Sequence, residues 1–456
     1  MALWHVKTSL SGFCKRAQEP MDGLFFGWWR IFFGGLLCFL VLRFFLYGWI
    51  DQLYIRPRLL FPYEGFFWLP RPSSKTIYML FTVMGICAFA IMLGFLYRLA
   101  TFGFLLLFAY VELLDKTNYL NHYYFLLLLC GLMLFMPFHR RCSIDAWLWK
   151  TRQPWTRGML WLLCFQVGIV YCFAGVAKLN SDWLLHAEPL RTWLVAHVDV
   201  PVLGRFFALS TTAFGMSWAG AFFDLSIVFF LLCERTRSYA FGVVVIFHLM
   251  TWKLFYIGLF PWFMMGGAAL FFAHSLPSCK HEKVTIDTIL SKDLWYVRVY
   301  RTARHVWVAL YLVTQCLFPL RHHLYPGWVC WTEEGFRFSW NVMLIEKNGH
   351  VDFWVVSQTT QRRWLVSPRT YLTPLQVKMM STQPDMILYF AHWLAEQYTT
   401  KFGGSMRVFA DAWVSLNGRT RQRFIDPHID LRTQPLWSWQ PRPWIAPFSF
   451  TQQRIR

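Results

Sequence analysis

The chain has 456 residues, of which 56% are hydrophobic, 20% are aromatic and only 15% are charged. Soluble globular proteins carry about 25% charged residues, so this composition excludes an ordinary soluble enzyme and predicts a multi-pass membrane protein. The formal net charge is +20 at pH 7, which is typical of basic residues that flank membrane spans. No basic run accompanies a base-stacking platform, so nucleic acid is not an expected partner.

Residues 1–23 form a mixed, polar segment that contains Lys7, Lys15 and Arg16. Basic residues before a first span favour the cytoplasmic side, so we expect a cytoplasmic N-terminal tail. No cleavable signal pattern precedes the first apolar run, which we therefore expect to act as an uncleaved insertion signal.

Long apolar runs then predict about nine membrane spans, since roughly 20 apolar residues cross a bilayer. An odd number of spans would place the C-terminal part outside the cell or in a lumen. The run at 99–114 follows its neighbour so closely that a hairpin or a re-entrant piece is an alternative. The expected spans cover residues 24–49, 76–98, 99–114, 122–137, 157–177, 213–233, 239–256, 258–274 and 303–319.

From residue 320 onward the pattern changes to that of a β-rich extramembrane domain with one helix. Asn348-Gly349 and Asn417-Gly418 each stand between strand-like runs, and Asn-Gly is the strongest short hairpin signal. Residues 408–416 alternate with a period of two, as in a half-buried strand. Residues 384–398 have apolar side chains at helical spacing. The predicted organisation is therefore a tail (1–23), a transmembrane bundle (24–319) and a β-rich domain (320–456).

Eleven cysteines are scattered, mostly within apolar runs, and form no CxxC pair. Neither a metal site nor a disulfide framework is therefore indicated, and we expect small core residues. The sequence also lacks GxSxG, HExxH and a phosphate-binding glycine loop. Hydrolase, zinc-protease and nucleotide-driven functions thus have no support.

Several polar side chains stand within or beside the apolar runs, where ionisable groups are costly and usually face a cavity or a partner. For residues 115–118, Asp-Lys-Thr-Asn, ordinary turn chemistry in an interfacial loop is an alternative to a functional role. His248 fits a hydrogen-bonded packing histidine, and Asp224 fits a pairing within the bundle. The candidates are Asp115, Lys116, Asn121, His122, Lys178, Asp224, His248 and Lys253.

Lys178 closes the apolar run that ends in VYCFAGVAKLNSDW, residues 170–183. Its long side chain could reach the lipid headgroups, or it could pair with Asp182 one turn later. A third possibility is proton chemistry at the membrane face. A lysine acts as a base only when it is neutral, and apolar neighbours favour the neutral form.

The segments LLDKTNYLNH (113–122) and VYCFAGVAKLNSDW resemble the membrane core of vitamin K-dependent gamma-carboxylases, also known as the HTTM domain. LGFLYRLAT, FFDLS and FHLMTWKLFYIGLF fit that family in order and spacing. In the C-terminal part FSWNVM, QRRW (361–364) and WVSLNGRTRQRFIDP (413–427) fit it too. The resemblance extends from about Met21 to Pro447.

This resemblance implies an enzyme that oxidises reduced vitamin K with O2 to the epoxide. The energy released generates a base that removes the γ-proton of a glutamate side chain, and the carbanion adds CO2. Phylloquinone or menaquinone hydroquinone would be the cofactor, no metal would be needed, and a glutamate-containing protein or peptide would be the substrate. Membrane lipid would surround the bundle, and we expect a compact bacterial homologue in the cytoplasmic membrane rather than in the endoplasmic reticulum.

The resemblance also implies roles for individual residues. The family's catalytic lysine falls on Lys178, although Ala177 replaces the lysine that precedes it in animal members. The functional histidine falls on His122, preceded by Asn121, and both would hold the quinone oxygens. Pre-placed donors of this kind stabilise an oxyanion. Tyr171 is a further expected contact of the quinone.

The glutamate substrate needs a cation, and arginine is the best bidentate partner of a carboxylate. Matched motifs supply Arg362, Arg363, Arg419 and Arg423. For each of these, a solvated basic strand face is the alternative. Trp340 lies in a segment that the family uses near the glutamate site.

Three departures keep rival functions open. Ile345 stands where animal members carry a histidine, and the cysteine of the animal first-loop disulfide is missing from residues 54–68. The chain also ends soon after the matched domain. A quinone epoxidase that carboxylates nothing is therefore one alternative. A non-enzymatic membrane binding or transport protein on the same fold is another, although binding alone does not require a buried base.

Overall fold

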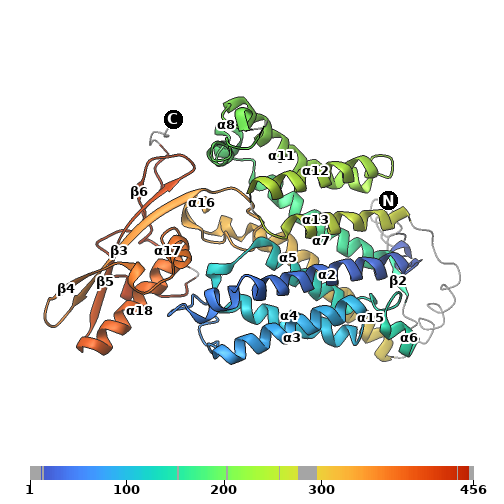
Figure 1. Ribbon diagram of the computed structural model, residues 1–456, viewed down its shortest axis with the longest axis horizontal. Coiled ribbons are helices and arrows are strands. Elements are labelled where there is room, and N and C mark those ends of the chain that lie inside the picture. The colour runs from blue at the N-terminus through green and yellow to red at the C-terminus, as the bar shows by residue number, and fades with distance from the viewer. Residues whose placement is uncertain are drawn as a thin grey trace, which may run out of the picture.

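The computed structural model describes residues 12, 15–150, 154–201, 204–255, 257–275, 295–438 and 440–450, with side chains from residue 302 in the helix that begins at Trp295. Most of the predicted cytoplasmic tail lies outside these residues. Long helices run side by side in one part of the molecule, and a twisted sheet flanked by helices forms the other (Figure 1). The small strand pair β1 (Pro20–Met21) and β2 (Trp155–Thr156) lies at the end of the helices that is remote from the sheet.

Within the described residues, six helices have the length and hydropathy to cross a bilayer. They bury one side in a shared core and expose large apolar side chains on the other, as lipid-facing helices do. Ser73 caps α3 by accepting a hydrogen bond from Thr76 N at 3.2 Å. The six are α2 (Leu24–Leu46), α3 (Ser74–Leu93), α4 (Tyr97–Leu114), α7 (Arg157–Ala177), α11 (Ser210–Leu232) and α12 (Arg237–Phe255).

The expected count of about nine spans is not confirmed, although a helix occupies each predicted segment. The run at 99–114 is one continuous helix, α4, rather than a hairpin. The helix α5 (Asn121–Phe135) has 15 residues, and α13 (Phe260–Ala269) has 10 before it tightens into η3 (Leu270–Ser275). The helix α15 (Trp295–Leu317) is long enough, but three arginines interrupt its first half. Length and charge therefore separate these three from the other six.

Short elements connect the long helices. They are η1 (Asp51–Ile55), η2 (Lys116–Asn118), α6 (Ile144–Trp149), α8 (Ser181–His186), α9 (Leu190–Val195), α10 (Gly204–Phe207), η5 (Phe318–Leu324) and α16 (Val329–Thr332). Asn180 caps α8 by accepting a hydrogen bond from Trp183 N at 3.0 Å. This cap leaves only Leu179 between Lys178 and the capped turn, so α8 and Lys178 are held close together.

The C-terminal part contains a four-stranded antiparallel sheet in the order β4-β3-β5-β6. The predicted alternation in β5 is confirmed, because Val408, Ala410, Ala412, Val414 and Leu416 are all buried. They pack against the predicted helix, which runs from Pro384 to Phe402 as α18. The strands and remaining helices are β3 (Lys347–Ser357), β4 (Arg363–Val366), β5 (Met406–Leu416), β6 (Gln422–Arg423), η6 (Pro368–Thr370), α17 (Pro374–Met380) and η7 (Leu431–Thr433).

One predicted hairpin is correct and the other is wrong. Asn417 and Gly418 have φ of 50° and 70° and turn the chain from β5 into β6, as predicted. Asn348-Gly349 instead lies inside β3, opposite Ser415 and Val414. A Cβ on Gly349 would stand 2.4 Å from the carbonyl oxygen of Ser381. The glycine is therefore needed for a close backbone approach rather than for a turn.

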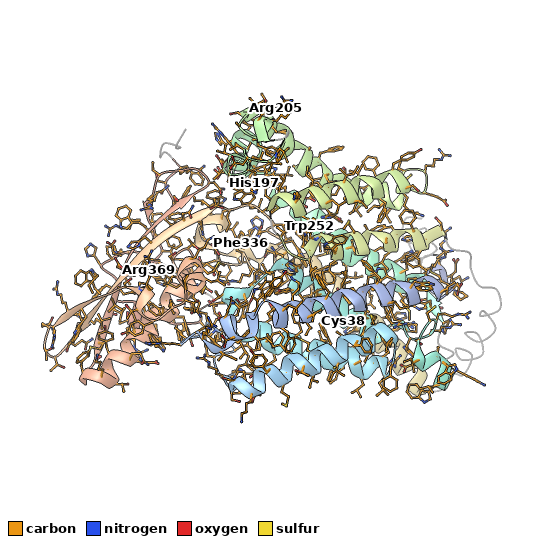
Figure 2. All side chains as sticks on the ribbon, viewed as in Figure 1. Cys38, His197, Arg205, Trp252, Phe336 and Arg369 are labelled. Carbon is orange, nitrogen blue, oxygen red and sulfur yellow. The ribbon has the colours of Figure 1, made fainter. Side chains whose placement is uncertain are left out.

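Buried ion pairs and hydrogen bonds join the helical part to the sheet part. Lys116 Nζ lies 2.6 Å from Asp385 Oδ2, and Arg337 binds the same oxygen at 2.8 Å. Arg442 pairs with Glu64 at a second point of the same junction. Side chains of the connecting segment around Phe336 occupy this junction between the bundle and the sheet (Figure 2).

Candidate functional site

A pocket with about 700 Å³ of space, including its open mouth, lies among α7, α11, α12 and α13. Its walls are mostly apolar and include Val170, Met216, Phe247 and Met264. Val342 and Met343 from the segment before the sheet close one side, so both parts of the molecule contribute. A largely apolar pocket with a few convergent polar groups is the usual form of a small-molecule site.

Lys178 is the C-terminal cap of α7, and its side chain reaches the pocket. Its Nζ donates to Asp224 Oδ2 at 2.7 Å and to the Ala174 carbonyl oxygen at 3.3 Å. Lys178 and Asp224 are each only 5% exposed. The ammonium therefore lies inside the protein and does not extend to headgroups. Its partner is the intramembrane carboxylate of α11, not Asp182.

Tyr171 and His248 form a second polar pair in the same pocket. The Tyr171 hydroxyl lies 2.8 Å from His248 Nε2, and both side chains are buried. Within the described residues His248 Nδ1 has no hydrogen-bond partner. The direction of the Tyr171–His248 bond depends on the imidazole tautomer, so this pair can hold a proton at either atom. The expected hydrogen-bonded His248 is therefore found, and its partner is a residue predicted to contact the quinone.

His122 and Asn121 begin α5 and do not line this pocket. The ring of Phe260 lies 6.0 Å from that of His122 and 5.9 Å from that of His248. Asn121 accepts from Tyr119 and donates to the Asn341 carbonyl oxygen at 3.3 Å. The two predicted donors thus lie next to the pocket, because His122 is near Phe260, which lines it, and Asn121 is bonded to Asn341, which precedes Val342 of the lining.

Trp340 is completely buried and packs on Tyr124 with ring centroids 5.0 Å apart. Its indole nitrogen has no hydrogen-bond partner within the described residues. Phe338, Trp340 and Met343 all have φ between 58° and 62°. Non-glycine residues in this left-handed region cost about 1–3 kcal/mol each and cluster at functional sites. This strained segment carries Val342 and Met343 into the pocket.

The predicted glutamate-binding arginines lie outside the pocket. Arg362 stacks over the Trp364 ring at 5.3 Å, and Arg363 lies opposite Val356 at the start of β4. The strand β4 forms the end of the sheet that points away from the helices (Figure 1). Both arginines are exposed, as a solvated strand face would be.

Arg423 and Arg419 follow the Asn417-Gly418 turn but have different surroundings. Arg423 lies on the Trp413 ring at 4.9 Å, and its side chain is 42% exposed. Arg419 is buried and binds both carboxylate oxygens of Asp182, at 2.7 and 2.5 Å. A substrate carboxylate could reach these Arg419 donors only by displacing Asp182.

The pKa values of the buried ionisable groups at the junction are shifted from their usual values. Burial raises the pKa of Asp385, but Arg337 and Lys116 more than reverse this and hold the pKa well below its usual range. Burial lowers the pKa of Lys116 against the attraction of Asp385. Burial also raises the pKa of Asp115 to about 6, although Thr117 and Phe61 donate hydrogen bonds to its carboxylate. The expected turn chemistry at residues 115–118 is thus present, within a buried electrostatic network.

Comparisons with known protein families match almost the whole described chain. Residues 18–275 match the HTTM domain, and residues 300–451 match the lumenal domain of vitamin K-dependent gamma-carboxylase. This chain belongs to the vitamin K-dependent gamma-carboxylase family. The search of solved structures gave no match. Membership implies reduced vitamin K, O2 and CO2 as reactants, and glutamate-containing proteins as the class of substrate.

Within the described residues, no group of three or more His, Cys, Asp or Glu side chains is placed so that it could hold a metal ion. Two polar residues of the pocket, Asp224 and His248, were expected to be structural when the sequence was considered alone. Their signal was their position at membrane depth, where an ionisable residue is a functional candidate by default. The sequence could not reveal that Asp224 pairs with Lys178 and that His248 pairs with Tyr171.

Proposed function

We propose that the chain is a vitamin K hydroquinone-dependent gamma-glutamyl carboxylase that couples O2-driven quinone epoxidation to carboxylation of protein glutamate. The observation that supports this most strongly is a buried lysine, Lys178, at the polar end of an apolar pocket. Binding alone does not require such a group. Proton abstraction from a lipid-soluble reactant, in contrast, requires a base inside an apolar pocket.

The residues of the pocket fit a quinone. Phe247, Phe260 and Met264 provide apolar walls for an aromatic ring system, and Tyr171 and Lys178 provide polar contacts at one end. When bound, reduced vitamin K and O2 supply the oxidative chemistry from which a strong base for the glutamate arises.

Lys178 is proposed as the base that accepts a proton from the hydroquinone hydroxyl. For this it must first be neutral. Asp224 can take the proton from Nζ along the 2.7 Å hydrogen bond, which leaves an uncharged amine in apolar surroundings. General base catalysis of this kind contributes typically 10²–10⁴-fold to a rate.

The remaining polar residues are proposed to hold the quinone oxygens. Tyr171 can donate its hydroxyl hydrogen bond to a quinone oxygen when His248 is protonated at Nε2 and donates to the Tyr171 oxygen. His122 and Asn121 are the family's donors for the same oxygens. His122 does not line the pocket that contains Lys178, but its ring lies 6.0 Å from that of Phe260, which does, so a rearrangement near Phe260 is needed for His122 to share the site.

The glutamate carboxylate is proposed to bind to an arginine of the C-terminal part, near Trp340. Arg362, Arg363, Arg419 and Arg423 are the candidates. Replacing each by glutamine should weaken carboxylation in at least one variant, measured as fixed labelled CO2. Normal carboxylation in all four variants would show that none of these arginines is needed to bind the glutamate.

A quinone epoxidase without carboxylation is the second candidate function. It is favoured by one observation: none of the four arginines lines the pocket that contains Lys178. Ile345 at the position of the animal histidine points the same way. The match of residues 300–451 to the lumenal domain of the carboxylase supports carboxylation, so the epoxidase stays the second candidate.

The proposed organisation places residues 24–319 in the membrane and residues 320–456 on the non-cytoplasmic side. The sheet and the β1–β2 pair lie at opposite ends of the long helices (Figure 1), which suits this arrangement. A glutamate substrate would then approach from the water side, while the quinone would enter from the bilayer.

The proposal is tested by Lys178→Ala in the purified protein, with epoxide measured from reduced vitamin K and O2. Loss of the base should lower the rate by about 10²-fold or more. Lys253→Ala is the control, because Lys253 is exposed at the end of α12 and does not line the pocket. Normal epoxide formation in Lys178→Ala would show that the proposed base is wrong.

A further inference from the structure

The turn between β5 and β6 lies far from Lys178 in the sequence but is bonded to the segment that follows it. Asn417 Nδ2 donates to Asp182 Oδ2 at 3.0 Å, and Arg419 binds both oxygens of the same carboxylate. Arg419 and Asp182 are 4% and 1% exposed. We call Asp182, Asn417 and Arg419 the clasp.

The clasp holds α8, and α8 holds the wall beside Lys178. Trp183 follows Asp182, and its ring lies 5.2 Å from Lys178 Nζ. The indole nitrogen of Trp183 donates to the Ser217 carbonyl oxygen of α11 at 2.7 Å. Lys178, Trp183 and α11 are therefore fixed together at the polar end of the pocket.

The clasp also holds a second part of the pocket wall. Asn417 accepts from Glu346 N at 2.9 Å and donates to the Leu344 carbonyl oxygen at 3.1 Å. Val342 and Met343, which line the pocket, directly precede this anchored pair. One turn of the sheet is thus bonded to two segments of the pocket wall, α8 and the segment that carries Val342 and Met343.

A buried bidentate arginine–carboxylate pair fixes distance and orientation together, which a single hydrogen bond does not. Its surroundings reinforce this, because the Arg419 guanidinium also contacts the rings of Trp328 and Phe448, at 5.8 and 5.4 Å from their centroids. Movement of the clasp would shift Trp183 and Met343 relative to Lys178. Misplacement of a catalytic group by about 1 Å can cost roughly 10²-fold in rate.

We propose that Arg419 and Asn417 are positioning residues, which act through Asp182 and α8 to set the geometry of Lys178 and its pocket. This inference rests on the proposed role of Lys178 as the base. It assigns to the C-terminal part a direct share in the quinone half of the reaction, in addition to presenting glutamate.

The test compares Arg419→Gln with Arg442→Gln in the full-length protein in detergent. Both remove an arginine from an ion pair that joins the two parts, but Arg442 is bound to the half-buried Glu64 and, among the described residues, contacts neither α8 nor Lys178. The first readout is kcat and KM for reduced vitamin K. Arg419→Gln should lower kcat by about tenfold or more, with KM changed by less than about threefold, and Arg442→Gln should leave kcat near that of the native chain.

A second readout does not depend on activity. Lys178 is labelled with a small amine-reactive reagent, and the labelling rate is measured by mass spectrometry relative to that of Lys253. This rate reports the surroundings of Nζ directly. It should change in Arg419→Gln and Asp182→Asn, and stay constant in Arg442→Gln. Arg419→Lys, which cannot reproduce the bidentate contact, should fall between the native chain and Arg419→Gln.

The outcomes separate the two proposals. Equal loss of kcat in Arg419→Gln and Arg442→Gln, or unchanged Lys178 labelling in Arg419→Gln, would overturn the positioning role. A native protein that forms no epoxide would overturn the proposed function. Labelling of Lys178 that still responds to Arg419→Gln in that case would leave the structural part of the inference standing.

Discussion

Two buried lysines of this chain meet a carboxylate at nearly the same distance, but in different regions. Lys178 lies 2.7 Å from Asp224 in the bundle, and Lys116 lies 2.6 Å from Asp385 at the junction with the sheet. Asp385 is shared with Arg337, so two cations hold one anion. Asp224 pairs with Lys178 alone among the described residues, and both line an open pocket.

This difference shows why an ion pair alone does not indicate catalysis. At Asp385 the second cation keeps the carboxylate charged, and its pKa lies far below the usual range. A proton from Lys116 is therefore not easily accepted there. At Asp224 no second cation competes among the described residues, and the lysine lines a pocket that a ligand can enter. The same residue pair thus serves as a fixed tie in one place and as a candidate proton carrier in the other.

Asp224→Asn tests whether Asp224 carries a proton, and we expect it to have the largest effect on activity of the variants described here. The amide can still accept a hydrogen bond from Lys178 Nζ but cannot receive its proton. Epoxide formation should fall by roughly 10²-fold, as for loss of a group in acid–base catalysis. Asp224→Glu retains a carboxylate and should recover part of the rate. An Asp224→Asn protein with the native rate would show that the pair is structural, like the one at the junction.

Lys116→Met should reduce stability instead of catalysis. Removing one partner of a buried pair costs about 3–5 kcal/mol, and Arg337 remains on Asp385, so the lower end is expected. The measurement is the free energy of unfolding in denaturant, together with epoxide formed per folded molecule. A large fall in that specific rate, with unchanged stability, would reverse the roles assigned to the two lysines.

The stability of the folded chain should depend on pH because of Glu334, a buried carboxyl group at the junction. Burial raises the pKa of Glu334 from 4.5 to about 7, against the attraction of Arg442. Between these values the folded chain holds a proton that the unfolded chain releases, so stability falls as pH rises through about 7. The melting temperature should drop by about 2 °C or more from pH 5.5 to pH 8. The drop should be smaller in Glu334→Gln, and an equal drop in both proteins would exclude Glu334 as its source.

The sequence predicted the helices better than it predicted what joins them. Apolar runs of sufficient length located α2, α3, α4, α7, α11 and α12, because bilayer thickness sets the length of a span. Residues 295–317 have the length of a span but include three arginines, and this lowered the count of candidate spans. The alternation in β5 was visible because one face of that strand is fully buried.

The sequence alone could not predict which residues far apart in the chain would pair. Asp224 is 46 positions from Lys178, and Arg419 is 237 positions from Asp182. Asn348-Gly349 carried the same local signal as Asn417-Gly418, yet a backbone contact with Ser381 decided its role. Position at membrane depth identified the ionisable residues of the site, while their partners depended on the packing of helices and sheet.

The central claim is best tested by one assay that follows both halves of the proposed reaction. Purified protein would receive reduced vitamin K, O2, labelled CO2 and a glutamate-containing peptide, and epoxide and fixed label would be measured together. We predict that both products form in the native chain and that both are lost in Lys178→Ala. Formation of epoxide without label would support the epoxidase alternative, and formation of neither product by the native chain would contradict the account.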